Sequence, residues 1–318
     1  MQKIPTEVQK DNNALDIRLV RTVTDCRHFQ MVQQRVWMSD DIDLIPFHVA
    51  MTIAKNGGIL LVARTADGPP ELDRMVGMVI GWPGLVLRMA DGSMVYKHCS
   101  HMTGVLPEWR SRDIGLRLKL AQREEILAQG VTDWITWTFD PLQHVNAVFN
   151  LHRLGTTSNI YMRNIYGEMR DEINAGLPTD RLQVDWRIRS QWVEDVLADK
   201  RDNSLWQVEA DKMQILATQE WGDGLHQPLR PNTLELEGNP IAVPIPDSVD
   251  AIRKQSIALM IEWRLFMRTV FEEAFGAGYV IIDCVQFQNT GLKLGWHYIL
   301  VPAYTIHYRL LKNNRDSK

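Results

Sequence analysis

The stretch that decides the fold is GVLPEWRSRDIG, from Gly104 to Gly115, which continues as LRLKLAQREEILAQG. It is typical of a strand end, a proline, a short basic turn and the start of a helix. Pro107 has no main-chain N–H and therefore stops the strand from pairing further. A helix start offers unpaired N–H groups and the positive end of the helix dipole. With the arginines beside it, this turn predicts a binding site for a phosphorylated ligand.

The elements on either side of the turn predict a mixed α/β fold. Apolar patterns and turn residues predict strands at 17–23, 58–66, 75–82, 94–106, 133–139, 160–166 and 182–188, and helices at 25–38, 46–55, 111–128 and 142–154. Three consecutive strands with hairpin-type links, followed by alternating elements, indicate a mixed sheet with helices on its faces. A doubly wound dinucleotide-binding fold would alternate from the start.

Two motifs in this region resemble a known family. VLPEWRSRDIG resembles the acyl-CoA-binding motif of the GNAT (Gcn5-related) N-acyltransferases: Arg or Gln, two residues, Gly, one residue, then Gly or Ala. That pattern falls on Arg110, Asp113 and Gly115, with Arg112 inside the turn. TWTFDPLQHVNAVFNLHRLG, residues 136–155, resembles the family's Asn-containing helix that ends in Leu-Gly. The motifs and the element order resemble a bacterial branch of the family, and they imply its mostly antiparallel sheet with helices on both faces.

The resemblance implies a site for acetyl-CoA or another acyl-CoA as co-substrate. The main chain of 102–105, which includes Val105, would pair with the pantetheine arm as an added strand. The N–H groups of 110–115, among them those of Ile114 and Gly115, would bind the pyrophosphate, and Arg110 and Arg112 would add charge-assisted bonds. Asn146 would contact the cofactor or the substrate amine.

The sequence departs from the family pattern at two positions. Asp113 stands where the family prefers glycine, and aspartate tolerates left-handed backbone better than most residues. Its carboxylate would repel a pyrophosphate, because two like unit charges about 4 Å apart cost on the order of 4 kcal/mol at an effective dielectric of 20. We expect neighbouring arginines to offset this charge, or the carboxylate to face solvent. Leu151 occupies the place where many members carry a tyrosine as general acid, so Tyr161 or Tyr166 is the alternative donor.

Acyl transfer also needs a group that takes a proton from the attacking ammonium. The candidates are His98, His101, Glu108 and Asp140. Strand alternation places His101 on the same face as Val105, and an imidazole suits the task near neutral pH. The predicted catalytic residues are therefore His101, Glu108 and Tyr161. No His, Cys, Asp or Glu cluster has metal-ligand spacing, so no metal is expected.

Three parts are predicted along the chain: a flexible lead at 1–16, a GNAT acyl-CoA-binding domain at 17–189, and a C-terminal α/β domain at 190–318. In the last part a strand at 240–246, a helix at about 250–277 and a strand at 279–287 repeat the layout of 102–139, which suggests a degenerate second half-domain. An independent partner-binding module is the alternative. Apolar spacing predicts a buried stripe at Leu116, Leu120 and Leu127 on one helix, and it places Ile257, Ile261 and Leu265 on one stripe of the other.

Composition narrows the class of protein. The chain has 318 residues, and 35 Lys plus Arg against 39 Asp plus Glu give it a net charge of −4. This acidic balance argues against general nucleic-acid binding, which needs a basic surface. It has neither an apolar run long enough to span a membrane nor an apolar signal core. Three scattered cysteines form no disulfide framework, which favours a reducing cytoplasm. We expect a small amine substrate, no nucleic acid and no membrane as partners, with a homodimer left open.

Three functions remain in competition at this level. The first is an acyl-CoA-dependent N-acyltransferase that transfers an acetyl or other short acyl group to the amine of a small metabolite such as an amino acid. The second is a non-catalytic acyl-CoA-binding or sensor protein, suggested by Asp113 and Leu151. The third is an acetyltransferase of protein lysines or N-termini.

Overall fold

The computed structural model describes residues 15–37, 44–88, 91–167, 177–200, 212–289 and 292–306, and the chain divides into two compact units, 1–132 and 133–318. Of the predicted flexible lead, residues 1–14 lie outside the described residues. The domain boundary predicted at 189/190 stays a prediction, while strand pairing inside the second unit crosses it.

In the first unit a meander of antiparallel strands runs in the order β1-β2-β3-β4. Its elements in chain order are β1 (Asp16–Leu19), α1 (Val23–Trp37), α2 (Phe47–Lys55), β2 (Ile59–Arg64), η2 (Pro70–Leu72), β3 (Met75–Leu87), β4 (Met94–Val105), η3 (Pro107–Trp109) and α3 (Ile114–Gln129). Asp91 and Gly92 lie between the long strand β3 and β4, and an Asp-Gly pair at such a place is typical of a hairpin turn.

Helices cover both faces of this sheet, and two glycines show how closely they approach it. A Cβ at Gly77 would meet Ile114 and Leu118 of α3, whereas a Cβ at Gly104 would meet Val36 at 2.7 Å, on α1. Gly104 lies opposite Met78 in the register, one step from Gly77, so the two glycines face opposite sides of the sheet. Helix α1 therefore packs on one face and α3 on the other.

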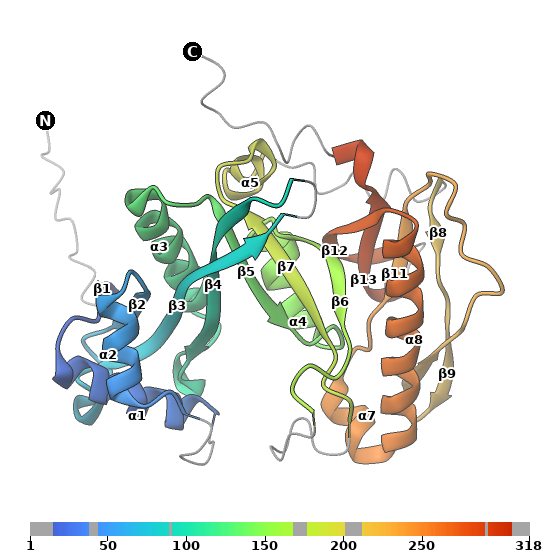
Figure 1. Cartoon of the computed structure of the whole chain (residues 1–318). Helices are drawn as coiled ribbons and strands as arrows, with labels where there is room; N and C mark the ends of the chain where they lie inside the picture. Colours follow the sequence, from blue (N-terminus) through green and yellow to red (C-terminus); the bar gives the residue numbers. More distant parts are fainter. Residues whose placement is uncertain are drawn as a thin grey trace, which may run out of the picture. The chain divides into compact units, whose positions relative to one another are not determined.

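In the second unit the sheet order is β5-β7-β6-β12-β13-β11-β8, and the hairpin β9-β10 stands apart from it. The elements are β5 (Trp134–Phe139), α4 (His144–Ala147), the π-helical turn η4 (Val148–Arg153), β6 (Thr157–Met162), β7 (Arg181–Arg187), α5 (Gln191–Leu197), β8 (Gln214–Ile215), β9 (Thr218–Gly222), β10 (Leu225–Pro228), β11 (Ile241–Pro244), α7 (Val249–Gln255), α8 (Ile257–Gly276), β12 (Tyr279–Asn289) and β13 (Leu292–Pro302). Helix α8 runs along β11, β12 and β13 (Figure 1).

The C-terminal part of this unit repeats the layout of its first part. In β5-helix-β6-β7 the last strand lies between the first two and is antiparallel to both, and the same holds for β11-helix-β12-β13. The two triplets meet where β6 pairs with β12, antiparallel, at Ile281 and Ser158. The β-helix-β unit expected at 240–303 is thus present, but its topology matches 134–187 rather than 102–139, because a third strand is inserted between the parallel pair.

The predicted fold class is confirmed. The strands and helices of 17–189 follow the predicted order, with helices on the sheet faces. Within each unit the described strand pairs are antiparallel except β8–β11.

Neither apolar stripe that the spacing picks out is the buried side of its helix, so the predicted burial of Leu116, Leu120 and Leu127 is wrong. Helix α3 buries Leu118, Lys119, Gln122 and Ile126 and leaves the predicted leucines half-buried. Helix α8 buries the stripe that contains Trp263, Phe266 and Val270, while Ile257, Ile261 and Leu265 are 36–45% exposed. The reason is the same in both helices: apolar residues recur on more than one side, and only the neighbouring sheet selects the side that is buried.

Candidate functional site

The turn between β4 and α3 has the left-handed backbone expected at Asp113, but helix α3 begins at Ile114 and not at residue 111, where the sequence predicts it. Pro107–Trp109 forms one 3₁₀ turn, and Ser111 and Asp113 both adopt left-handed backbone, with φ of 61° and 57°. Asp113 therefore takes the conformation for which the family uses glycine. Alternation of left-handed and ordinary residues turns successive N–H groups toward one side, an arrangement that forms anion-binding concavities.

The main-chain donors of this turn fall into two sets: two of them bond to the turn itself, which removes the N–H of Arg110 from the expected pyrophosphate donors, and, within the described part of the chain, four of them do not. Trp109 N donates to Leu106 O and Arg110 N to Pro107 O, which closes the 3₁₀ turn. Among the described residues, no main-chain carbonyl accepts from the N–H groups of Ser111, Arg112, Ile114 or Gly115. The last two also lie at the positive end of the 16-residue helix α3, where an anion is stabilised.

Three arginines and one aspartate surround these donors, all exposed. Arg110 Nε donates to Val105 O at 3.3 Å, and Arg117 donates to Leu15 O at 3.3 Å. Arg112 lies 3.7 Å from Asp67 Oδ2, a contact weak enough for the guanidinium to turn to another anion. Because Asp113 is exposed, water screens its carboxylate from a ligand on the turn.

A β-bulge in β4 changes the surroundings of His101. The register pairs Ile80 with Met102 but Gly81 with Ser100, so His101 is the extra residue. Alternation does not carry across a bulge, and the expectation that His101 shares a face with Val105 therefore lacks its basis. The imidazole is exposed and lies 5.0 Å from the Trp82 ring, centroid to centroid. Partial desolvation lowers the pKa of His101, which keeps it neutral at pH 7.

The other candidate bases are engaged elsewhere. His98 is buried, and burial lowers its pKa to about 4. Glu108 is exposed and pairs with Arg35 at 3.1 Å; its own main-chain N–H and Arg35 lower the pKa of Glu108, which makes it a weaker base. Asp140 is held by Arg264. Of the four candidates, His101 has the surroundings that best suit a base.

A buried polar chain lies between β4 and α3 and was missed by the sequence reasoning. Lys119 Nζ donates to Ser100 Oγ at 2.8 Å, Ser100 Oγ donates to Gln122 Oε1 at 2.9 Å, and Gln122 Nε2 lies 3.4 Å from His98 Nε2. Lys119 is 2% exposed, and burial lowers its pKa to about 7. The sequence gives only a weak indication that Lys119 is buried, because the ammonium group of a lysine is usually solvated even where leucines flank it.

In the second unit Asn146 lies exposed on the short helix α4. The π-helical turn that follows buries Leu151 completely, so the place of the family's tyrosine belongs to the core. Asn150 is also buried, and its side-chain oxygen accepts from Trp137 Nε1 at 3.1 Å. A π turn inserts one residue into a helix and is frequent at functional sites.

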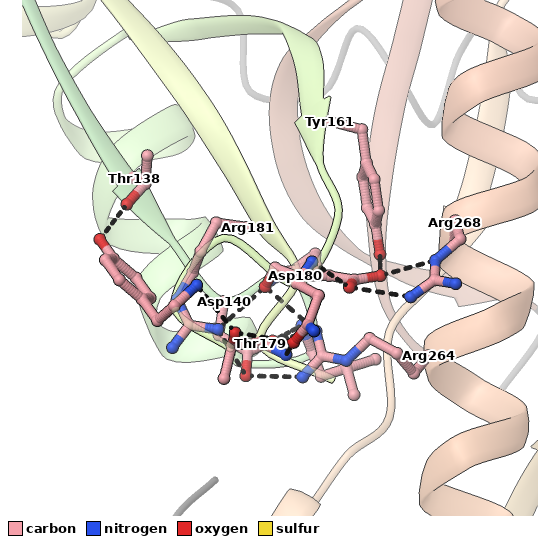
Figure 2. Close-up of polar contacts among 12 residues, drawn as sticks. Thr138, Asp140, Tyr161, Thr179, Asp180, Arg181, Arg264 and Arg268 are labelled. Atoms are coloured by element: carbon pink, nitrogen blue, oxygen red, sulfur yellow. Dashed lines mark hydrogen bonds and ion pairs between the residues drawn. The ribbon is translucent and has the colours of Figure 1, made fainter. Parts of the chain in front are cut away.

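Tyr161, the predicted proton donor, belongs to a charged network in the same unit (Figure 2). Its hydroxyl donates to Asp180 Oδ2 at 2.8 Å, and burial raises the pKa of Tyr161 well above its usual value. Arg268 forms a bidentate pair with Asp180 at 2.9 Å in both bonds. Burial alone would raise the pKa of Asp180, but the hydrogen bonds from Arg268, Asn164 N–H and Tyr161 lower it. A hydroxyl held in this way is a weak acid, and a catalytic role for Tyr161 stays a prediction.

The predicted site residues fall into two groups. His101, Val105, Glu108, Arg110, Arg112, Asp113, Ile114 and Gly115 lie together along the end of β4 and the start of α3, in the first unit. Asn146 and Tyr161 belong to the second unit. In the described part of the chain, no group of three or more His, Cys, Asp or Glu side chains could hold a metal ion. None of the described helices is both long and apolar enough to cross a bilayer.

Comparison with known proteins gives similar structures but no matching sequence. No family model and no curated protein matches the chain. Among solved structures, it is similar to an acetyltransferase of the GNAT family from Desulfovibrio desulfuricans, at 13% identity over 55% of this chain and 99% of that chain, with a TM-score of 0.40. A GNAT-family acetyltransferase from Streptococcus pneumoniae is 16% identical over 54% of this chain and 98% of that one, with a TM-score of 0.41. Arabidopsis thaliana NAA60 in complex with acetyl-CoA is 11% identical over 54% and 98% of the two chains, with a TM-score of 0.43.

Proposed function

We propose that the chain is a GNAT-type N-acyltransferase that uses acetyl-CoA or another acyl-CoA and acylates the amine of a small metabolite such as an amino acid. The observation that carries the proposal is the turn at 107–115. It combines two left-handed residues, main-chain N–H groups without backbone partners and exposed arginines at a helix start. These features suit the pyrophosphate of coenzyme A.

The proposed reaction forms a C–N bond and breaks the thioester C–S bond. The amine must lose a proton to attack, and the thiolate that leaves must gain one. His101 is neutral at pH 7 and exposed, so it can accept the amine proton directly or through water. Holding the amine close to the thioester supplies much of the remaining rate.

Calorimetry with acetyl-CoA and succinyl-CoA tests the binding step. We expect the wild type to bind at least one of them, and Arg112→Ala to weaken binding about 10-fold, the loss of one charge-assisted contact of about 1.4 kcal/mol. Arg88→Ala is the matched control, because Arg88 is an equally exposed arginine that pairs with Asp91 away from the turn. Absence of binding at millimolar concentrations, or an equal loss in the control, contradicts the proposal.

One observation favours the alternative of a non-catalytic acyl-CoA sensor. Leu151 is buried where the family places its acid, and the hydroxyl of Tyr161 is bound to Asp180. Thioester turnover with a broad panel of amines and peptides separates the functions. Turnover of a small amine supports the proposal, turnover of peptides alone indicates a protein acetyltransferase, and binding without any turnover indicates a sensor.

A further inference from the structure

The loop that follows β5 leads directly to Asn146, and its conformation is fixed near its start. Asp140 Oδ1 accepts from Leu142 N at 2.9 Å, and Asp140 O accepts from Gln143 N at 3.1 Å. Ala147 N then donates to Gln143 O at 3.0 Å, which begins helix α4. A movement of Asp140 would therefore pass through this chain of bonds to the turn that carries Asn146.

A buried arginine of helix α8 forms a bidentate ion pair with Asp140. Arg264 of α8 donates from Nη1 to Asp140 Oδ1 at 2.7 Å and from Nη2 to Asp140 Oδ2 at 2.9 Å (Figure 2). The Arg264 side chain is only 2% exposed. A bidentate guanidinium–carboxylate pair fixes direction as well as distance. A buried ion pair often stabilises the folded protein no better than apolar side chains of the same volume would. We therefore look to the geometry that the pair fixes rather than to its contribution to stability.

Further C-terminal groups hold the rest of the loop. Tyr298 on β13 is fully buried and donates its hydroxyl to Pro141 O at 2.7 Å. The His144 ring stacks on Trp296, with centroids 5.9 Å apart and planes at 10°. Burial lowers the pKa of His144, and the carboxylate of Asp247 and the main chain of Pro246 work against that lowering.

We propose that Arg264 and Tyr298 are positioning residues that fix the 140–146 loop, and with it the exposed Asn146, in the conformation in which Asn146 takes part in the proposed reaction. The inference rests on the proposed function and gives the C-terminal repeat a role in it. In this role Arg264 of α8 and Tyr298 of β13, both in the C-terminal repeat, hold the loop after β5, which belongs to the preceding repeat. Neither Arg264 nor Tyr298 needs to touch a substrate.

A double-mutant cycle tests this inference. Asn146→Ala, Arg264→Met and the double variant are compared in kcat/KM for the acyl-CoA and, by calorimetry, in the dissociation constant of coenzyme A. If Arg264 acts through the loop, we expect each single variant to lose about 10- to 100-fold in kcat/KM. The double variant should then lose no more than the more severe single variant.

Milder variants and a stability control keep the test decisive. Arg264→Lys retains the charge without the fork and should fall between wild type and Arg264→Met. Tyr298→Phe should lose about 3- to 10-fold, and nothing further when Asn146 is already alanine. Met267→Ala removes buried apolar atoms from the same helix and should keep wild-type kcat/KM while the protein is folded.

The outcomes separate the two proposals. A wild type that neither binds nor turns over acyl-CoA overturns the proposed function, and the positioning role with it. An active wild type in which the losses from Asn146→Ala and Arg264→Met multiply, or in which both Arg264→Lys and Tyr298→Phe keep full activity, overturns the positioning role alone.

Discussion

Replacement of Lys119 by methionine should stabilise the first unit, most strongly at low pH. The ammonium lies 2% exposed between α3 and β4, and it donates to Ser100 Oγ at 2.8 Å. Burial lowers its pKa from 10.5 to about 7. Methionine has nearly the same length, carries no charge and suits the apolar contacts of the α3 stripe.

The sign follows from proton binding. An unfolded lysine keeps its proton up to about pH 10.4, whereas the folded one releases it above about pH 7. The unfolded chain therefore binds more protons between these values, and the free energy of unfolding of the wild type rises with pH across this range. At about 1.4 kcal/mol per pKa unit, the buried charge costs roughly 5 kcal/mol at pH 6 and roughly 2 kcal/mol at pH 9.

Urea denaturation at pH 6 and pH 9 measures the effect. The stability gain of Lys119→Met over wild type should shrink by about 3 kcal/mol between the two pH values, with the slope of the urea dependence unchanged. Lys55→Met, at the exposed end of α2, is the control and should give a difference independent of pH. A gain that is the same at both pH values for Lys119→Met would refute the burial of a titrating lysine.

Two further predictions concern the proposed site. Asp113→Gly should tighten acyl-CoA binding about 5-fold, because it removes an exposed charge whose repulsion of the ligand is worth about 1 kcal/mol in water. Glycine adopts the φ of 57° without strain. Unchanged affinity by calorimetry would show that the carboxylate does not interact with the ligand. His101→Gln should lower kcat/KM about 100-fold at pH 7 and abolish the fall in activity that we expect of the wild type in acid, where the imidazole becomes protonated at a pH below its usual range because partial burial lowers the pKa of His101; a pH–rate profile that keeps this limb would assign the base to another group.

Local sequence predicted the features that depend on neighbours along the chain. Pro107 and the arginines of the turn stand where the pattern places them, and Asp113 adopts the left-handed backbone expected of it, although α3 begins at Ile114 instead of residue 111. The order of strands and helices in 17–189 was equally predictable, since apolar periodicity and turn residues act over short distances.

The buried sides of the helices were not predictable in this way. Helix α3 carries apolar residues on more than one side, and the chosen stripe includes Lys119 and Gln122 because Ser100 and His98 face them from β4. The bulge at His101 likewise depends on the pairing of β3 with β4. The buried side of α3 and the position of the bulge both depend on neighbouring strands, and a local sequence pattern does not predict which residues those strands place opposite.

What the sequence by itself determined is the turn at 107–115 and the class of fold around it, because proline, left-handed aspartate and a helix start act on their immediate neighbours. What only the tertiary structure decided is that the C-terminal repeat copies 134–187 and that Arg264 reaches Asp140, 124 positions away. Contacts over such separations depend on how strands and helices pack together, and the separate segments carry no sign of them until the chain has folded.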